Sequence, residues 1–568
     1  MGRGRIMLAA LTAASLLAGP ASARATERNR TLVFVTEDIP AGLNYDGPAA
    51  AIATTQTGFV NLMDPLVGYA PAGANGEGVG LLDFTRFEGR LAERWEFDPA
   101  TLTWTFHLRR GVRSCAGNEL TADDVVYTFA RAKSVSGAAP IGWFLSAVGS
   151  IAGFTPEVLS DPAKRALGDE VRKLDEYTVA IRQSAPNRLF LPALTTFGLL
   201  IFDAKEARRH ATAADPWSHD HLNNVGSAGF GPYCLERWRK GDEMVLRANP
   251  HYYGDAPAID RVVIKRVPQS SNRFILLRMG EAQLAERLTP RELLKLRETD
   301  GVRVAGVTGN ENLFVHMNHK VPPFDDVRIR RAVAAALPTD WIVRNGYFGQ
   351  AEPWPGLVPA SYPGYRPDLD AFRRDHDLAK RLLAEAGYPE GRGLERYAEA
   401  FRLTYIAEKE ATLGPIATKL RMALRDIGLP VELDPIPSTQ YGDRQLVKKD
   451  LPFALNDQEK PVVVDAGYAV QLFFASPGAG GVNNMVNYAN AEVDRLWTEA
   501  RNEADEAVRA TKVAEIQSIL TREVAWLPVV QYRTQWALAP GLEGLVWHPD
   551  NAVRFAGLRF AGAKGEGS

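Results

Sequence analysis

The sequence lacks the short motifs that mark the common catalytic mechanisms. It has no G-x-x-x-x-G-K-[ST], G-x-G-x-x-G, H-E-x-x-H, C-x-x-C or G-x-S-x-G segment. These patterns are typical of phosphate-binding loops, dinucleotide-binding folds, zinc proteases, redox cysteine pairs and serine hydrolases. Their absence argues against an enzyme, and the sequence gives no reason to assign a catalytic residue.

Long apolar runs are absent as well. No stretch after the N-terminus approaches the roughly eighteen apolar residues that a membrane-spanning helix requires. Segment 1–23 has Arg3 and Arg5, a short apolar run, and small residues at Ala21 and Ala23. This pattern is typical of a secretory signal peptide that is cleaved after Ala23. No cysteine follows the run, so no lipid anchor is indicated, and we expect the mature chain in the periplasm.

Charge of one sign is not in excess. The chain has 66 Lys and Arg against 68 Asp and Glu, a net charge of −2 that becomes −4 once the signal peptide is removed. Proteins that bind nucleic acid or anionic membranes carry a marked positive surplus. Neither partner is therefore expected.

Cysteine and metal-binding side chains are scarce. Cys115 and Cys234 are the two cysteines, and export would permit a disulfide between them, although two separate buried thiols fit the sequence equally well. His316 and His319 form the one suggestive histidine pair, but on a strand they would face opposite sides. We therefore expect no metal site and no cofactor.

The 568 residues are too many for one core and predict two to four packed units. Alternation of apolar residues predicts a strand over 102–108, and Thr121 should cap a helix whose first turn holds Asp123 and Asp124. Further strands are expected over 31–36 and 259–268, and Ser271 should cap a helix that continues to Glu286.

A joint rich in Gly and Asn over 306–312 separates a second unit from the first. In this unit a strand over 401–407, a helix that ends at Gly428 and a further strand predict a parallel α/β crossover. We expect 491–524 to form one helix, and 525–539 to form one strand that returns to the first unit.

Four blocks in the same order resemble the family 5 extracellular solute-binding proteins, the periplasmic receptors of peptide, nickel and related ABC importers. They are "LAERWEFDPATLTWTFHLRRGVRSCAGNELTADDVVYTFARA", "GSAGFGPYCLERWRKGDEMVLRANPHYYGDAPAIDRVVIKRVP", "VHMNHKVPPFDDVRIRRAVAAAL", and "YANAEVDRLWTEA" with "VAWLPVVQY". The resemblance spans nearly the whole mature chain. It implies a receptor that captures a peptide or peptide-like solute and delivers it to the permease of an inner-membrane ABC importer.

The resemblance also implies an architecture. The expected fold is an α/β, two-lobed binding protein of class II, cluster C type, with an extra subdomain in the first lobe. Lobe I should comprise 24–62, 181–311 and 528–568, the subdomain 63–180, and lobe II 312–527. The hinge strands should cross near 311–318 and 527–533, and the protein should act as a monomer whose cargo lies between the lobes.

A cargo site of this kind needs aromatic walls and a few fixed polar groups. The wall candidates are Tyr45, Trp341, Trp354, Tyr468 and Trp536. The polar anchors should come from Asp457 and Asp465, because the resemblance places a cargo-contacting loop of lobe II there. Asp465 is the favoured anchor, and Asp465→Asn should weaken a cationic cargo by about 1.5–3 kcal/mol. Its alternative role is to cap the backbone before Gly467.

One departure from the family pattern affects the cargo. Peptide receptors of this family commonly hold the peptide ammonium group with an Asp. If Asp465 matches the later Asp of that pattern, this position falls near Val462, whereas an alternative register uses Asp457. An opine, a glycan, a metal chelate or another non-peptide solute therefore stays open as cargo, for import or for sensing. A secreted hydrolase whose catalytic residues meet only after folding also stays open.

Overall fold

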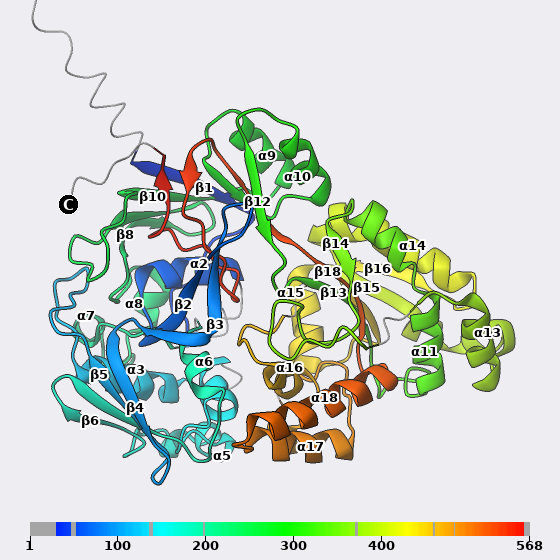
Figure 1. The fold of residues 1–568 in the computed structure, drawn as a ribbon, viewed down its shortest axis with the longest axis horizontal. Helices are drawn as coiled ribbons and strands as arrows, with labels where there is room; N and C mark the ends of the chain where they lie inside the picture. Colours follow the sequence, from blue (N-terminus) through cyan, green and yellow to red (C-terminus); the bar gives the residue numbers. More distant parts are fainter. Residues whose placement is uncertain are drawn as a thin grey trace, which may run out of the picture.

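Two large mixed sheets organise the protein, whose structure is a computed structural model (Figure 1). It describes residues 30–46, 53–135, 140–196, 199–369, 373–457, 460–481 and 483–561. The expected signal peptide, 1–23, lies outside these residues. We use lobe I for the seven-stranded sheet with the elements around it and lobe II for the six-stranded sheet with its helices.

The sheet of lobe I has the order β12-β19-β11-β1-β10-β9-β8. Its strands are β1 (Thr31–Thr36), β8 (Tyr233–Arg239), β9 (Glu243–Ala248), β10 (Arg261–Arg266), β11 (Leu284–Glu286), β12 (Arg303–Val307) and β19 (Thr534–Leu538). β1 pairs in parallel with both β10 and β11. The predicted strands over 31–36 and 259–268 are thus confirmed, the second in shortened form.

The helix expected from Ser271 to Glu286 is wrong beyond its first half. Helix α9 (Ser270–Arg278) ends early because Gly280 adopts a left-handed conformation with φ of 73°. The following residues form β11, which pairs with β1 in the middle of the sheet. Helix α10 (Pro290–Arg297) comes next, with Thr289 and Glu292 forming a capping box.

The sheet of lobe II has the order β14-β18-β13-β17-β15-β16. Its strands are β13 (Asn312–Met317), β14 (Ala351–Pro353), β15 (Arg402–Ile406), β16 (Glu432–Ile436), β17 (Phe453–Asn456) and β18 (Leu527–Tyr532). Helix α14 (Glu410–Arg425) connects β15 to β16, and these strands are parallel, as predicted. Helices α11 (Val327–Ala336) and α13 (His376–Glu385) pack together at the far side of this lobe.

The chain crosses between the lobes twice. It passes from β12 to β13 through 308–311, and from β18 to β19 through Arg533 alone. The single strand expected over 525–539 is therefore wrong, because its two halves pair in different sheets. The crossings lie at the edges of the segments expected for the hinge. The two sheets take their strands from the chain segments in the predicted order. The exact boundaries of lobe I, the subdomain and lobe II stay a prediction.

The segment expected as a subdomain contains a four-stranded antiparallel sheet, β4-β5-β7-β6. Its strands are β4 (Ala92–Asp98), β5 (Thr103–Leu108), β6 (Val171–Asp175) and β7 (Thr178–Arg182). Helix α3 (Ala122–Ser134) begins after Thr121, whose backbone N–H donates to Asp124 Oδ2 at 2.7 Å. This confirms the predicted strand and helix start. Helix α2 (Ala53–Leu62) and the hairpin of β2 (Val67–Ala74) and β3 (Gly80–Gly89) precede them.

The lobes contact each other away from the hinge through three helices of lobe II. These are α16 (Ala466–Phe473), α17 (Ala491–Arg501) and α18 (Glu506–Arg522), and one hydrophobic core continues from lobe I into them. Gln471 Nε2 donates to Ala147 O at 2.6 Å, and Arg501 Nη2 donates to Ser150 Oγ at 3.0 Å. The single helix expected over 491–524 is wrong, because Asp505 caps a new helix.

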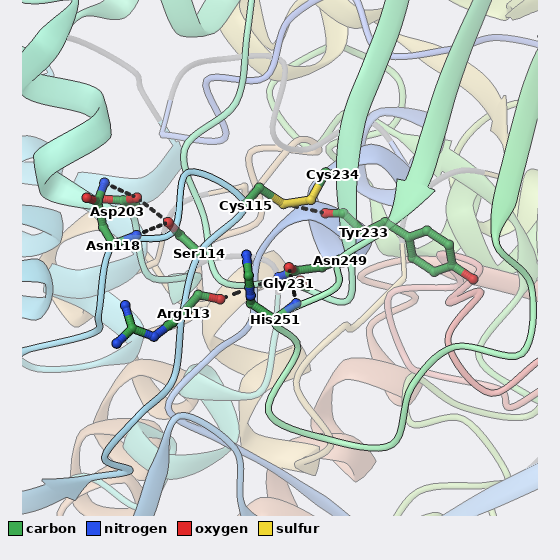
Figure 2. Close-up of a disulfide and its surroundings, with 10 residues drawn as sticks. All are labelled: Arg113, Ser114, Cys115, Asn118, Asp203, Gly231, Tyr233, Cys234, Asn249 and His251. Atoms are coloured by element: carbon green, nitrogen blue, oxygen red, sulfur yellow. Dashed lines mark hydrogen bonds between the residues drawn. A yellow bond between two sulfur atoms is a disulfide. The ribbon is translucent and has the colours of Figure 1, made fainter. Parts of the chain in front are cut away.

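A disulfide joins Cys115 and Cys234, whose Cα atoms are 5.6 Å apart (Figure 2). Cys115 lies in the loop after β5, and Cys234 lies on the edge strand β8. The neighbouring Ser114 Oγ donates to Asp203 Oδ2 at 2.5 Å. The bridge thus ties the four-stranded sheet to the main sheet of lobe I, and the hypothesis of two separate thiols is excluded.

Candidate functional site

The carboxyl ends of the parallel strands of both sheets converge on one cavity between the lobes. In lobe I, Glu37 directly follows β1 and Arg287 directly follows β11. In lobe II, Lys409 lies just beyond β15 and Asp457 directly follows β17. Ligands of open α/β sheets bind outside the carboxyl ends of the strands. This position makes the cavity the candidate site.

The cavity, called the interlobe cavity below, has a volume of about 210 Å³. Both lobes and the crossing strands line it with charged, amide and aromatic side chains. Its main lining side chains are Glu37, Gln269, Arg273, Glu286, Arg287, Glu311, Tyr347, Gln350, Glu408, Lys409, Asp457, Tyr532, Arg533, Gln535, Trp536 and Asn551. Ligand pockets typically measure about 300–1,000 Å³, so this volume favours a small solute.

Opposite charges face each other around this cavity. Arg287 Nε lies 3.4 Å from Glu37 Oε1. Lys409 Nζ donates to both carboxylate oxygens of Asp457, at 2.7 and 2.9 Å. The walls therefore offer carboxylates to an ammonium group and cations to a carboxylate, which is the pattern that a zwitterion requires.

A third ion pair lies beside the first hinge crossing. Lys460 Nζ is 2.7 Å from Glu311 Oε1, and both side chains are buried. Tyr532 Oη donates to Glu311 Oε2 at 3.2 Å, and Asn551 Nδ2 donates to Glu311 Oε1 at 3.2 Å. Glu311 thus joins the crossing segment to a loop of lobe II and to the C-terminal segment of the chain.

The neighbouring charges keep the key carboxylates of the site ionised. Burial opposes ionisation of Glu37, but Arg287 and Lys409 outweigh it and hold its pKa below the ordinary value. Burial likewise opposes ionisation of Glu311, and Lys460 with Arg287 lowers its pKa. Glu286 behaves differently, because burial raises its pKa.

Aromatic and amide side chains complete the interlobe cavity. The rings of Tyr347 and Tyr532 stack with centroids 4.9 Å apart. Gln350 of lobe II donates to Pro290 O at 2.8 Å and accepts from Gln535 Nε2 at 2.9 Å. These bonds connect lobe II to lobe I at the rim, so opening the lobes would break them.

Of the residues predicted as cargo contacts, Asp457 and Trp536 line the interlobe cavity. Tyr45 is buried against Phe202, and Tyr468 is buried in the core that both lobes share. Trp354 is also buried, with its indole N–H donating to Val358 O at 3.1 Å. Trp341 is partly buried against the core of lobe II, near Lys419. The structure brings none of these four to the interlobe cavity.

Asp465 makes two internal contacts. It is the N-cap of α16 and accepts from Gly467 N at 2.7 Å, and its Oδ1 lies 2.6 Å from Arg509 Nη2. The contact with Gly467 N is the helix-capping role that the sequence predicts as the alternative for Asp465. Both contacts go to Oδ1 of the carboxylate that was expected to hold cargo, and its role as an anchor stays a prediction.

The substitution Asp465→Asn distinguishes the two roles. Asn still caps a helix, but Arg509 is almost fully buried and loses its charged partner. We expect the free energy of unfolding to fall by about 1–2 kcal/mol, measured by chemical denaturation without cargo. An unchanged stability together with weaker cargo binding, measured by calorimetry, would instead restore the anchor role.

The charged residues of lobe I in this cavity were not predicted. Glu37 could have been predicted as a site residue. It directly follows the predicted strand over 31–36, and ligands bind beyond the carboxyl ends of such strands. Arg287 carried no such signal, because β11 was assigned to a helix.

His316 and His319 both contact other groups of the protein. Among the described residues, no group of three or more His, Cys, Asp or Glu side chains could hold a metal ion. His316 Nδ1 contacts Gln445 Nε2 at 3.2 Å, and His319 Nε2 contacts Ala525 O at 3.1 Å. Burial lowers the pKa of each histidine to about 3, helped at His319 by Arg330.

These buried histidines predict acid sensitivity. Between pH 6.5 and 3 the unfolded chain binds protons that the folded chain excludes, so stability falls as the pH is lowered through this range. From pH 7 to pH 5.5 the two histidines together should cost about 2–3 kcal/mol. Urea denaturation at both pH values measures the loss, and His316→Gln should reduce it. A stability that is constant over this range would contradict the prediction.

The chain matches a known protein family over most of its length. Residues 86–480 match the family model described as "Bacterial extracellular solute-binding proteins, family 5 Middle". The chain is 27% identical over 466 residues to the probable D,D-dipeptide-binding periplasmic protein DdpA of Escherichia coli K12, which covers 82% of this chain and 83% of that protein. No helix of the described residues is long and apolar enough to cross a membrane.

Two solved structures share the fold. One is the periplasmic binding protein DppA from Helicobacter pylori in complex with the peptide STSA, with a TM-score of 0.76, 22% identity, and coverage of 94% of this chain and 99% of that chain. The other is MoaA from A.tumefacien R10 in complex with mannopinic acid, with a TM-score of 0.75, 22% identity, and coverage of 94% and 100%. At this identity the likeness concerns the fold alone.

Proposed function

Because the chain belongs to the family 5 bacterial extracellular solute-binding proteins, we propose that it is a periplasmic receptor for a peptide or peptide-like solute. It captures the solute between its lobes as a monomer and delivers it to the permease of an inner-membrane ABC importer. The charged interlobe cavity, to which both lobes contribute, is the observation that carries the proposal.

The charges of this cavity favour a zwitterionic cargo over a neutral one. A small peptide carries an ammonium and a carboxylate group, and each needs a fixed partner once it leaves water. Glu37 and Asp457 can meet the ammonium group, and Arg287 and Lys409 can meet the carboxylate. Cargo that touches both lobes stabilises the closed arrangement, and this arrangement is what an importer recognises.

A second candidate cargo is a non-peptide solute such as an opine. It is favoured by Val462, because in one of the two registers of the family pattern this apolar residue falls where peptide receptors commonly place an Asp. Val462 lies outside the interlobe cavity. The structural neighbour MoaA, in complex with mannopinic acid, makes an opine a concrete alternative.

Native mass spectrometry of the protein from its own periplasm tests the proposal. We expect a bound small solute, released by denaturation and identified by its mass, and calorimetry with that compound should then give its affinity. An opine or chelate would select the second candidate. Conversion of the compound on incubation would contradict a receptor and support the secreted hydrolase.

The substitution Arg287→Met tests the cavity. It removes one fixed cation from the site, and the loss of a charge-assisted hydrogen bond of about 1.5–3 kcal/mol should weaken an anionic or zwitterionic cargo by roughly 10- to 100-fold. Arg291→Met is the matched control, because Arg291 is exposed on α10 and does not line the interlobe cavity. Equal affinities of the two variants for the identified cargo would remove Arg287 from the site.

A further inference from the structure

A second cavity, called the hairpin cavity below, lies mostly within lobe I and has a volume of about 280 Å³. The hairpin β2–β3 forms one side of it, and α2 and the C-terminal segment 544–557 form much of the rest. Gly80 N donates to Leu545 O at 2.8 Å, and Trp547 N donates to Gly80 O at 3.0 Å, so hairpin and C-terminal segment are bonded together. This cavity is larger than the interlobe cavity.

A layer of hydrogen-bonded side chains separates the two cavities. Asn310 Nδ2 donates to Pro461 O at 3.0 Å and to Pro549 O at 2.6 Å, and its Oδ1 accepts from Asn551 Nδ2 at 2.8 Å. Pro549 lines the hairpin cavity, whereas Asn551 lines the interlobe cavity. Among the described residues, none lines both cavities. A molecule in the hairpin cavity would therefore lie outside the interlobe cavity, where the proposed function places the cargo.

The walls of the hairpin cavity are mainly apolar. They include the side chains of Val60, Met63, Leu81, Leu82, Leu200 and Val462. Its charged groups are already paired within the protein. Asp64 accepts from Arg90, Tyr252 and Tyr253 at 2.8–3.1 Å.

The ion pair between Asp550 and Arg554 in these walls is likewise satisfied within the protein. Arg554 contacts both oxygens of Asp550 at 2.7 Å. Glu88 lies 4.0 Å from Arg90 and is partly exposed. The apolar majority of the wall side chains therefore favours a neutral ligand.

One buried polar atom points to a ligand. Tyr69 is only 6% exposed and lines the hairpin cavity, yet its hydroxyl makes no hydrogen bond of normal geometry to the described residues. Burial raises the pKa of Tyr69, and hydrogen-bond contacts with the Thr195 side chain and the Val464 backbone offset this rise only in part. Buried hydroxyl groups almost always have a partner, so this oxygen is suited to a ligand group.

We propose that the hairpin cavity is a second small-molecule site, which takes a neutral amphipathic solute with an apolar ring and one hydrogen-bonding group directed at the Tyr69 hydroxyl. Apolar walls with one placed polar group are the usual composition of such sites. Val462 is the wall residue that lobe II supplies, so the solute completes its contacts when the lobes are closed. It would consequently act as an effector that favours closure.

Indole is the probe for this site, because it is neutral, has an apolar ring and carries one N–H that can donate to Tyr69 Oη. We expect a crystal soaked with indole to show it in the hairpin cavity within hydrogen-bond distance of Tyr69. In solution, saturation-transfer NMR should detect binding. Tyr69→Phe, which removes only the hydroxyl, should weaken binding by about three- to ten-fold.

Leu81→Trp places a large ring in the hairpin cavity and should abolish indole binding. Leu174→Trp is the matched control, since Leu174 is half exposed on β6 and does not line the cavity. Indole found only in the interlobe cavity, or bound equally by wild type and Leu81→Trp, would overturn the proposal. If Leu81→Trp does not fold, equal affinity of Tyr69→Phe and wild type overturns it. Cargo binding by the same variants reports separately on the proposed receptor function.

Discussion

Replacing both Cys115 and Cys234 with Ser is expected to lower the free energy of unfolding by about 4–5 kcal/mol. The bridge closes a sequence separation of 119 residues, and loop-closure entropy grows with the length of the closed loop. The bridge also ties the four-stranded sheet to edge strand β8. Without the bridge, the unfolded chain gains conformational entropy, whereas the folded chain does not.

Guanidinium denaturation of three samples measures this effect. The oxidised protein should unfold at the highest denaturant concentration, and the reduced protein should match the double Ser variant. Reductant should leave the double variant unchanged, which controls for effects of the reductant itself. Identical midpoints for the oxidised and reduced protein would show that packing alone holds the two sheets together.

Local patterns in the sequence predicted local structure well. Strand β5 and the start of α3 followed from alternation and from a capping residue, because both depend on neighbours within a few residues. The crossover from β15 through α14 to β16 was predicted for the same reason. The family, and with it the two-lobed fold, followed from four ordered sequence blocks.

The errors arose where distant segments decide the structure. The residues of β11 continue an apolar pattern that suits a helix, but they pair with β1 in the middle of the sheet of lobe I. Residues 527–538 look like one strand, yet their two halves join different sheets. Asp465 illustrates the same limit, since its partner Arg509 is 44 residues away. The sequence could suggest a polar group there but not its partner.

The substitution Lys460→Met is expected to lower the free energy of unfolding by about 3–5 kcal/mol. The Lys460 and Glu311 side chains are only 10% and 8% exposed, and their charged atoms are 2.7 Å apart. Met preserves most of the packing volume of Lys, but it leaves the Glu311 carboxylate buried without its cation. Removing one partner of a buried pair costs much more than removing both.

The double substitution Lys460→Met/Glu311→Gln therefore provides the control. Gln can still contact Tyr532 and Asn551, which are the neutral partners of Glu311. We expect it to recover most of the lost stability in a double-mutant cycle measured by urea denaturation. Equal losses for the single and double variants would show that the charge of Glu311 is not the cause.

The dependence on pH gives an independent test of the same pair. In the wild type, Lys460 and Arg287 overcome burial and lower the pKa of Glu311, so its contribution to stability is lost as the pH falls through and below 4.5. Without Lys460, we expect burial to outweigh the remaining Arg287 and Lys409 and to raise that pKa. The variant then gains relative stability as the carboxylate is protonated, and its deficit should shrink between pH 7 and pH 4.5. A deficit that stays constant over this range would exclude an unpaired carboxylate at the hinge as its source.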